Sequence, residues 1–297
     1  MQISMTLPTM LAQGRTELLD WCAAVDAGPW ASLAVPERTM YPSHALVPQL
    51  AAAAALTERV RLWTTIVILP AHSPVQVAKD MATVDQISAG RLTVGVGVGG
   101  READYRSIGA SFERRWQRMD DGVALMRKVW AGEPVIEGGE PVGPPPVQPG
   151  GPPIVAGVMG PKALARASHW AAGVDDGTTV THVNENALAG NIERVRAAWK
   201  DAGRSDSPHL SASLWYALGD LNDVPAQERL HDYAYRYLEI FGSEIATMMA
   251  DAATVSTPEA LRDAVDAAAN AGCDELFLVP TTTDVTELDR SRDALGI

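Results

Sequence analysis

Basic residues are scarce in this chain of 297 residues. It has 24 lysines and arginines against 37 aspartates and glutamates, which gives a formal net charge of -13 at pH 7. A nucleic-acid partner is therefore not expected, because neutralising a phosphate backbone requires a basic face. Only four of the cationic residues are lysines. Any anionic ligand must be bound by arginines, backbone N–H groups or the positive ends of helices.

Cysteines and long apolar runs are also rare. The two cysteines, Cys22 and Cys273, fall in helix-like and strand-like patterns without the spacing of metal ligands. They are expected to be buried thiols in a reducing compartment, with a disulfide as the alternative. No apolar run reaches the roughly 20 residues that span a bilayer, and the N-terminus lacks the pattern of a signal peptide. We therefore expect a soluble cytoplasmic protein.

Hydrophobic residues make up 46% of the chain, and their clearest pattern runs from Arg59 to Gly100. Val60–Leu69 has many β-branched residues and few polar positions, which predicts a parallel strand buried on both faces. A helix is predicted from Ser73 to a stop at Gly90, and a second buried strand covers Leu92–Val98. A strand–helix–strand unit of this kind implies a parallel sheet.

The same alternation repeats along the whole chain. Eight strands separated by helices predict an α/β fold, a single (β/α)8 barrel over residues 1–297. The predicted strands are Ile3–Leu7, Trp30–Val35, Val60–Leu69, Leu92–Val98, Pro153–Val158, Gly173–Thr181, His209–Leu218 and Glu275–Val279. Two segments are longer than a barrel requires. Residues 133–153 hold eight of the twenty prolines and are expected to be irregular, whereas residues 224–253 are expected to be helical.

Residues spread over nearly the whole chain carry a resemblance to a known family. The central ones are Pro70-x-His72-x-Pro74, Ala78-Lys79-x-x-Ala82-Thr83-x-Asp85, Ser88-x-Gly90-Arg91-Leu92 and Gly95-x-Gly97-x-Gly99. Others are Gly109, Phe112, Arg114, Arg115, Asp120, Trp130, Pro152, Pro153, Ile154, Gly157, Asp176, Gly177 and Gly272-Cys273-Asp274-Glu275. In these positions the sequence resembles the luciferase-like monooxygenase superfamily. Its central stretch is most similar to the members that use the deazaflavin F420 rather than FMN.

The resemblance implies a flavin-like ring at the C-terminal mouth of the barrel. In F420-using members the third strand ends in a bulge with a non-proline cis peptide under the ring, which by register falls at Ile66–Val67. The glycines that follow the fourth strand would bring bare backbone near the ring, although the same pattern suits a tight turn or small residues packed inside a barrel. The implied cofactor-binding residues are Ile66, Val67, His72, Gly97, Gly99, Gly100, Val158, Met159, Gly160 and Pro161.

Three of these assignments have a plain structural alternative. The segment from Val158 to Pro161 begins a helix whose N–H groups suit a phosphate monoester, but an ordinary strand-to-helix turn has the same pattern. His72 either contacts the hydroxylated side chain of the cofactor or caps the following helix. Arg101 and Arg106 either meet the acidic tail of F420 or are solvated loop charges.

Glu37 and Arg38 follow the second predicted strand, where some F420 enzymes have an Asp-His pair. They are the candidate catalytic residues, but arginine stays charged at neutral pH and cannot relay a proton. Glu37 then orients the ring or acts as an acid or base, and a salt bridge with Arg38 is the alternative. Gly100 stands where the sugar-phosphate dehydrogenases of this family have a glutamate, which argues against that activity.

Candidate substrate-contacting residues are Met5, His182 and Trp215, with Tyr216 beside Trp215. Aromatic residues in barrel strands are more often part of the core, and His182 alternatively lies on the surface. Asp85 and Arg91, on either side of the Gly90 stop, are expected to pair. No histidine or cysteine cluster suggests a metal site.

The resemblance implies an F420-dependent oxidoreductase that transfers a hydride between C5 of the deazaflavin and a small organic substrate. One alternative is an FMN-dependent monooxygenase that uses reduced flavin and O2 and needs a separate flavin reductase. Another is a cofactor-binding barrel without turnover. Residues facing the substrate are expected in the loops 137–153 and 183–253, and the segment 224–253 offers a surface for a homodimer.

Overall fold

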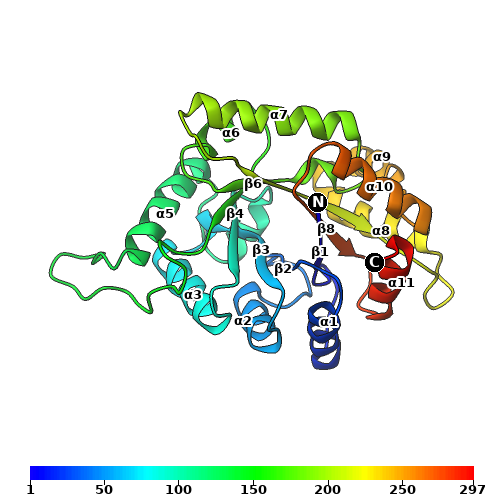
Figure 1. Cartoon of the computed structure of the whole chain (residues 1–297), viewed down its shortest axis with the longest axis horizontal. Helices are drawn as coiled ribbons and strands as arrows, with labels where there is room; N and C mark the ends of the chain where they lie inside the picture. Colours follow the sequence, from blue (N-terminus) through cyan, green and yellow to red (C-terminus); the bar gives the residue numbers. More distant parts are fainter.

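The computed structural model describes all 297 residues, and it confirms the predicted barrel (Figure 1). Eight parallel strands close in chain order. They are β1 (Gln2–Thr6), β2 (Ser32–Val35), β3 (Arg61–Ile68), β4 (Leu92–Gly97), β5 (Ile154–Gly157), β6 (Gly173–Asp176), β7 (His209–Tyr216) and β8 (Glu275–Pro280).

Helices surround the strands on every side in Figure 1. They are α1 (Arg15–Ala27), α2 (Leu46–Leu56), α3 (Pro74–Ile87), α4 (Glu102–Ser107), α5 (Arg115–Trp130), α6 (Pro161–Ala167), α7 (Glu185–Asp201), α8 (Ala226–Leu238), α9 (Ser243–Asp251), α10 (Pro258–Asn270) and α11 (Thr286–Leu295). Three short 3-10 turns, η1 (Leu69–Ala71), η2 (Gly177–Thr179) and η3 (Glu239–Phe241), complete the secondary structure.

The hydrophobic core has two layers because successive strand residues point to opposite faces. In β2, Leu33 and Val35 belong to a cluster of 58 buried residues between strands and helices. Ala34, between them, packs instead with Trp63 and Phe277 inside the barrel. Burial on both faces explains why these strands are apolar almost throughout.

The N-terminal end of the barrel interior is closed by hydrogen bonds. The buried carboxylate of Glu275 accepts from Ser4 Oγ at 2.5 Å and from Ser32 Oγ at 2.6 Å. It also lies 3.2 Å from His209 Nε2. These bonds fill the N-terminal end of the interior with paired side chains, and the opposite end, where the strands run out, is the usual site end of such barrels.

The irregular segment 133–153 contains no helix or strand, as predicted, and it forms the long loop beyond α3 and α5 in Figure 1. Its Gln148 accepts from Arg61 Nη2 at 3.1 Å and donates to the Leu92 carbonyl at 2.7 Å. Arg61 and Leu92 begin β3 and β4, so this part of the loop lies at the N-terminal end of the barrel. The expectation that this segment faces the substrate is therefore wrong.

Asp85 and Arg91 do not pair with each other, contrary to the prediction. Asp85 accepts hydrogen bonds from the backbone of Val147 and Gln148 and thereby fixes the long loop to α3. Arg91 donates to backbone carbonyls that include Thr57 at 2.6 Å. The residues are close in sequence, but their side chains leave the helix end in different directions.

The mouth of the barrel has two helical features that the sequence analysis did not predict. The polar stretch after β4 contains the short helix α4, for which no helix was predicted. The segment 224–253 is helical as predicted but divides into α8 and α9. Together with Trp215 of β7, buried residues of this hairpin form a separate hydrophobic cluster. Because the hairpin follows β7, it lies on the same side of the barrel as the C-terminal strand ends.

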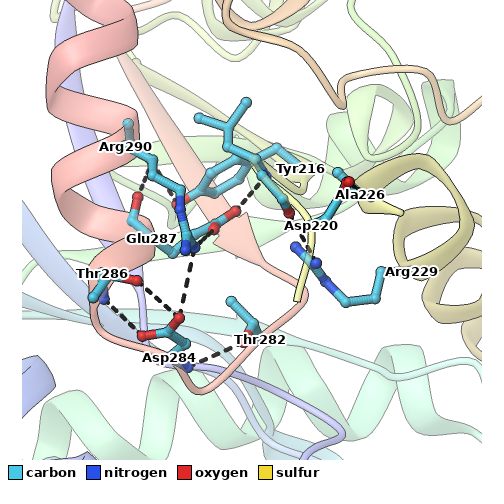
Figure 2. Close-up of polar contacts among 12 residues, drawn as sticks. Tyr216, Asp220, Ala226, Arg229, Thr282, Asp284, Thr286, Glu287 and Arg290 are labelled. Atoms are coloured by element: carbon cyan, nitrogen blue, oxygen red, sulfur yellow. Dashed lines mark hydrogen bonds and ion pairs between the residues drawn. The ribbon is translucent and has the colours of Figure 1, made fainter. Parts of the chain in front are cut away.

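A polar network joins α11 to the ends of β7 and β8 (Figure 2). The buried carboxylate of Glu287 accepts from the Leu218 N–H and from Arg290 Nη1, the latter at 3.0 Å. Arg290 also lies 3.6 Å from Asp284. Burial raises the pKa of Glu287 despite these donors. The network fixes α11 against the C-terminal ends of β7 and β8.

Both cysteines are free and buried, which confirms the expected thiols. Burial raises the pKa of Cys22 and of Cys273 to about 12. Neither thiol is therefore ionised at neutral pH. None of the helices is both long and apolar enough to cross a membrane.

Candidate active site

At the base of the mouth, the side chain of Ile66 packs against Gly97 and Gly157. The β3–β4 register shifts between Thr64 and Val67, which is the predicted bulge, and Ile66 within it is half-buried. A Cβ on Gly97 would lie 2.1 Å from Ile66 Cδ1, and one on Gly157 would lie 3.0 Å from Ile66 Cγ2. The glycines therefore make room for Ile66. The sequence analysis gave two interpretations of Gly97, contact with the cofactor or a small residue packed inside the barrel. The close approach of Ile66 to Gly97 agrees with the second.

The non-proline cis peptide of the bulge is the bond Thr65–Ile66. It lies one residue earlier than the predicted Ile66–Val67, so that position was wrong. Val67, also assigned to the cofactor, is buried in the main core. Gly99 has a φ of +60°, and Gly100 is exposed with no atom within 4 Å of an added Cβ.

Glu37 and His72 form the polar pair of the mouth. Glu37 lies two residues beyond β2, and His72 directly follows η1 at the end of β3. His72 Nε2 lies 2.6 Å from Glu37 Oε1, and the Ile68 N–H donates to Glu37 Oε2 at 2.6 Å. Ser73, not His72, caps α3 with its side chain. The predicted helix-capping alternative for His72 is therefore wrong.

The hydrogen bond that His72 donates to the Glu37 carboxylate raises the pKa of His72, and partial burial opposes this change. The side chain of His72 is 34% exposed, whereas that of Glu37 is 13% exposed. With the carboxylate facing Nε2, the other ring nitrogen, Nδ1, is left to exchange a proton. The pair can therefore act as an acid–base group, and His72 keeps its proton to a higher pH than a free imidazole does.

Arg38 pairs with a residue that the sequence analysis did not consider. Its Nε donates to Asp104 Oδ2 of α4 at 3.0 Å, and both side chains are more than nine-tenths buried. The predicted salt bridge between Glu37 and Arg38 is wrong, since each residue has its own partner. Arg38 cannot exchange a proton, so it can offer a ligand at the mouth only charge and hydrogen-bond donors.

The predicted phosphate segment lies on the surface of the mouth. Val158 is buried, while Met159, Gly160 and Pro161 are exposed after the end of β5. Gly160 has a φ of +81°, which a glycine adopts without strain. The phosphate role of this segment stays a prediction.

The predicted substrate residues are not brought together. Met5 is completely buried in the main core, and Trp215 packs edge-on against Tyr233 and Tyr237. Both positions match the core alternative. His182 is exposed, with Nδ1 3.2 Å from Thr181 Oγ1.

A family model described as luciferase-like monooxygenase matches residues 1–237. This chain belongs to that family. An uncharacterized protein of Mycobacterium tuberculosis is 30% identical over 209 residues, which are 68% of this chain and 68% of that protein. The 2,5-diketocamphane 1,2-monooxygenase 1 of Pseudomonas putida is 30% identical over 146 residues, 45% of this chain and 38% of that enzyme. The 5,10-methylenetetrahydromethanopterin reductase of Archaeoglobus fulgidus is 29% identical over 144 residues, 46% of this chain and 41% of that enzyme.

Solved structures of luciferase-like barrels share the whole fold. An F420-dependent secondary alcohol dehydrogenase in complex with an F420-acetone adduct has a TM-score of 0.76 and 21% identity, covering 99% of this chain and 98% of that one. The oxygenating constituent of 3,6-diketocamphane monooxygenase of Pseudomonas putida, in complex with FMN, has a TM-score of 0.73 and 14% identity, covering 98% of each chain. Membership of the luciferase-like family supports an oxidoreductase, and its members use either F420 or a flavin.

The mouth of this luciferase-like barrel suits a planar heterocycle. Ile66 offers a half-exposed apolar surface, and the glycines beneath it hold it in place without side chains of their own. Glu37 and His72 stand at the adjoining strand ends. No group of three or more His, Cys, Asp or Glu side chains is placed to hold a metal ion.

The pairing of Glu37 with His72 and of Arg38 with Asp104 was missed by the sequence analysis. Each pair joins residues that are 35 or 66 positions apart. The available signal was that all four residues follow strand ends, which meet at one rim of a barrel. That signal indicates a shared rim but not which side chains meet.

Proposed function

We propose that this protein is an F420-dependent oxidoreductase that transfers a hydride between the deazaflavin and a small organic alcohol or carbonyl compound. The observation that carries the proposal is the hydrogen-bonded pair of Glu37 and His72. Interconversion of an alcohol and a carbonyl moves one proton with each hydride, so a proton-exchanging side chain at the mouth is required. His72 meets this requirement, which the arginine at position 38 does not.

Each residue of the mouth has a distinct role in this proposal. F420 would supply the hydride acceptor or donor at C5 of its ring. Ile66 supports the ring, and the closed barrel beneath it excludes water. His72 takes the hydroxyl proton of an alcohol substrate, or returns it to a carbonyl. Glu37 stabilises the charged imidazole, and the Ile68 N–H holds the Glu37 carboxylate in position.

The FMN-dependent monooxygenase is the second candidate. The sequence identity of 30% to the 2,5-diketocamphane monooxygenase favours it, because no relative reported above has a higher identity. Such an enzyme takes reduced FMN and O2, and it would need a partner reductase. The two candidates therefore differ in the cofactor that the purified protein binds.

The deciding experiment is a titration of the protein with F420 and with FMN, each oxidised and reduced, followed by cofactor fluorescence. We expect a dissociation constant of about a micromolar or below for F420 and no saturable binding of FMN. Binding of FMN alone, with consumption of O2 by the reduced complex, would instead establish the monooxygenase. Binding of F420 without hydride exchange to any alcohol or carbonyl compound would indicate a barrel without turnover.

Variants test the role of His72. His72→Gln is expected to bind F420 normally but to reduce secondary-alcohol oxidation by about 10²- to 10⁴-fold. His169→Gln is the matched control, because His169 is an exposed histidine of the outer surface. The rate of alcohol oxidation by the wild type should depend on pH through the titration of His72. This dependence should be absent in His72→Gln. Equal activity of both variants would remove His72 from the mechanism.

A further inference from the structure

Three arginines converge on one tyrosine at the mouth. Arg38 follows β2, Arg101 directly precedes α4, and Arg236 lies in the last turn of α8. Their guanidinium carbons lie 3.6, 5.8 and 5.5 Å from the ring centre of Tyr41. Arg101 also lies 4.9 Å from the ring of Tyr237. We call Arg38, Arg101, Arg236 and the two tyrosines the arginine cluster.

The arginine cluster carries more positive charge than its neighbours neutralise. Arg38 has a carboxylate partner, Asp104. Arg101 donates to the carbonyl of Tyr237, and Arg236 donates to the carbonyl of Met10 at 3.5 Å, but neither forms a salt bridge. Arg101 and Arg236 therefore bring two cations to the cluster that no carboxylate pairs. Packing on tyrosine rings lowers their free energy but leaves the charge in place.

Two polar atoms in the cluster are buried without a partner. The side chain of Arg38 is only 8% exposed, and its Nη1 makes no hydrogen bond. The hydroxyl of Tyr41 is likewise buried and without a partner. A buried donor without an acceptor destabilises the folded state, by about 1–3 kcal/mol in typical cases. An oxygen-bearing anion beside Tyr41 would supply the missing acceptors.

We propose that the arginine cluster binds an anionic group of the substrate, a carboxylate or a phosphate. The inference rests on the proposed function, since it names the class of substrate that the same mouth accepts. The donors range from the exposed Arg236 through the half-buried Arg101 to the buried Arg38, so an anion can approach from solvent. The planar guanidinium group of arginine can donate two parallel hydrogen bonds to the oxygens of a carboxylate or a phosphate. Arginines can therefore bind an anion in this chain, which has few lysines.

The position of the cluster fits a substrate held by its charged end. Arg38 directly follows Glu37 in the chain, so the cluster adjoins the Glu37–His72 pair. A substrate anchored at Arg38 by its anionic end would therefore lie at the same rim of the barrel as His72. An alternative role for the cluster is to fasten α8 to the barrel, and this alternative predicts no ligand.

The test is a calorimetric titration of the cofactor-free protein at low ionic strength with sodium benzoate and, separately, with inorganic phosphate. We expect one site with a dissociation constant in the millimolar range for at least one anion. Arg101→Gln and Arg236→Gln should each weaken binding about tenfold, as loss of a charged donor does. Arg196→Gln is the control, because Arg196 is an exposed arginine of α7 outside the cluster. It should bind both anions as the wild type does.

The outcomes separate this inference from the proposed cofactor. Tighter binding of benzoate than of phosphate assigns a carboxylate substrate, and the reverse order assigns a phosphate. No saturable binding, or equal weakening in Arg196→Gln, would overturn the inference. If the cluster only fastens α8, the two cluster variants will lose thermal stability and the wild type will bind neither anion. Because the titration uses no F420, failure of the protein to bind F420 would refute the proposed cofactor and leave this result unaffected.

Discussion

Alanine substitutions at three glycines of the β4 region should have sharply different effects on stability. A Cβ on Gly95 would lie 2.2 Å from the Thr64 carbonyl oxygen, and a Cβ on Gly97 would lie 2.1 Å from Ile66 Cδ1. A Cβ on Gly100 would meet no atom within 4 Å. None of the three has a positive φ, so alanine introduces no backbone strain and only space decides.

The nature of the atom that obstructs the new Cβ sets the size of the effect. At Gly97 the obstructing atom ends a side chain that can rotate, so overpacking costs about 1–3 kcal/mol. The reduced freedom of the unfolded chain offsets about 0.4–1 kcal/mol of this. At Gly95 the obstructing atom is backbone within the sheet, so we expect a loss of about 3 kcal/mol or more. Gly100→Ala should be neutral or slightly stabilising.

Thermal unfolding followed by circular dichroism measures this order. We expect Gly97→Ala to lower Tm by about 2–6 °C, on the scale of 2–4 °C per kcal/mol for chains of this size class. A second substitution isolates the contact, because Ile66→Val removes the Cδ1 atom that Gly97→Ala would strike. The double variant Gly97→Ala/Ile66→Val should therefore be more stable than the sum of the single effects predicts. If Gly97→Ala is as stable as the wild type, or if the effects in the double variant are strictly additive, the packing described for Ile66 against Gly97 is refuted.

Three further predictions concern buried titratable groups. Glu287→Ala should lower the free energy of unfolding in urea by about 1–3 kcal/mol because the Leu218 N–H loses its acceptor, whereas Glu287→Gln should lower it less; equal losses would contradict that role. Burial raises the pKa of Asp175 to about 6, so the folded state holds a proton longer than the unfolded state and stability should fall as pH rises from about 4 to about 6. Asp175→Asn should abolish this fall in urea titrations, and an unchanged pH slope would exclude Asp175 as its source. Cys22 and Cys273 should resist a thiol reagent in the native protein and both react after unfolding, and rapid native labelling would show that burial does not protect them.

Local patterns were sufficient to predict the fold. The helix predicted from Ser73 to a stop at Gly90 is α3 (Pro74–Ile87), and the predicted strand Glu275–Val279 ends one residue short of β8. Buried parallel strands and capped helices leave periodic and punctuating residues in short windows, so their positions follow from nearby sequence. The short helix α4 was missed because a single polar turn of helix has no apolar periodicity.

The candidate site was predicted only as a set of residues at the correct rim. Strand order in a barrel brings Glu37, Arg38 and His72 to the same end, so their common location followed from the sequence. Their partners did not, because the choice between Arg38 and His72 for Glu37 depends on how the chain leaves β2 and β3. The tertiary structure decided that choice through the Ile68 N–H, which holds the carboxylate toward His72.

The amino-acid sequence by itself determined that this chain is a (β/α)8 barrel of the luciferase-like family, because both properties depend on patterns distributed along the chain. Only the tertiary structure decided where the bulge lies, which loop faces away from the mouth, and which arginines gather around Tyr41. These features depend on contacts between residues far apart in sequence. Such contacts are set by strand register and side-chain packing, which no short window of sequence contains.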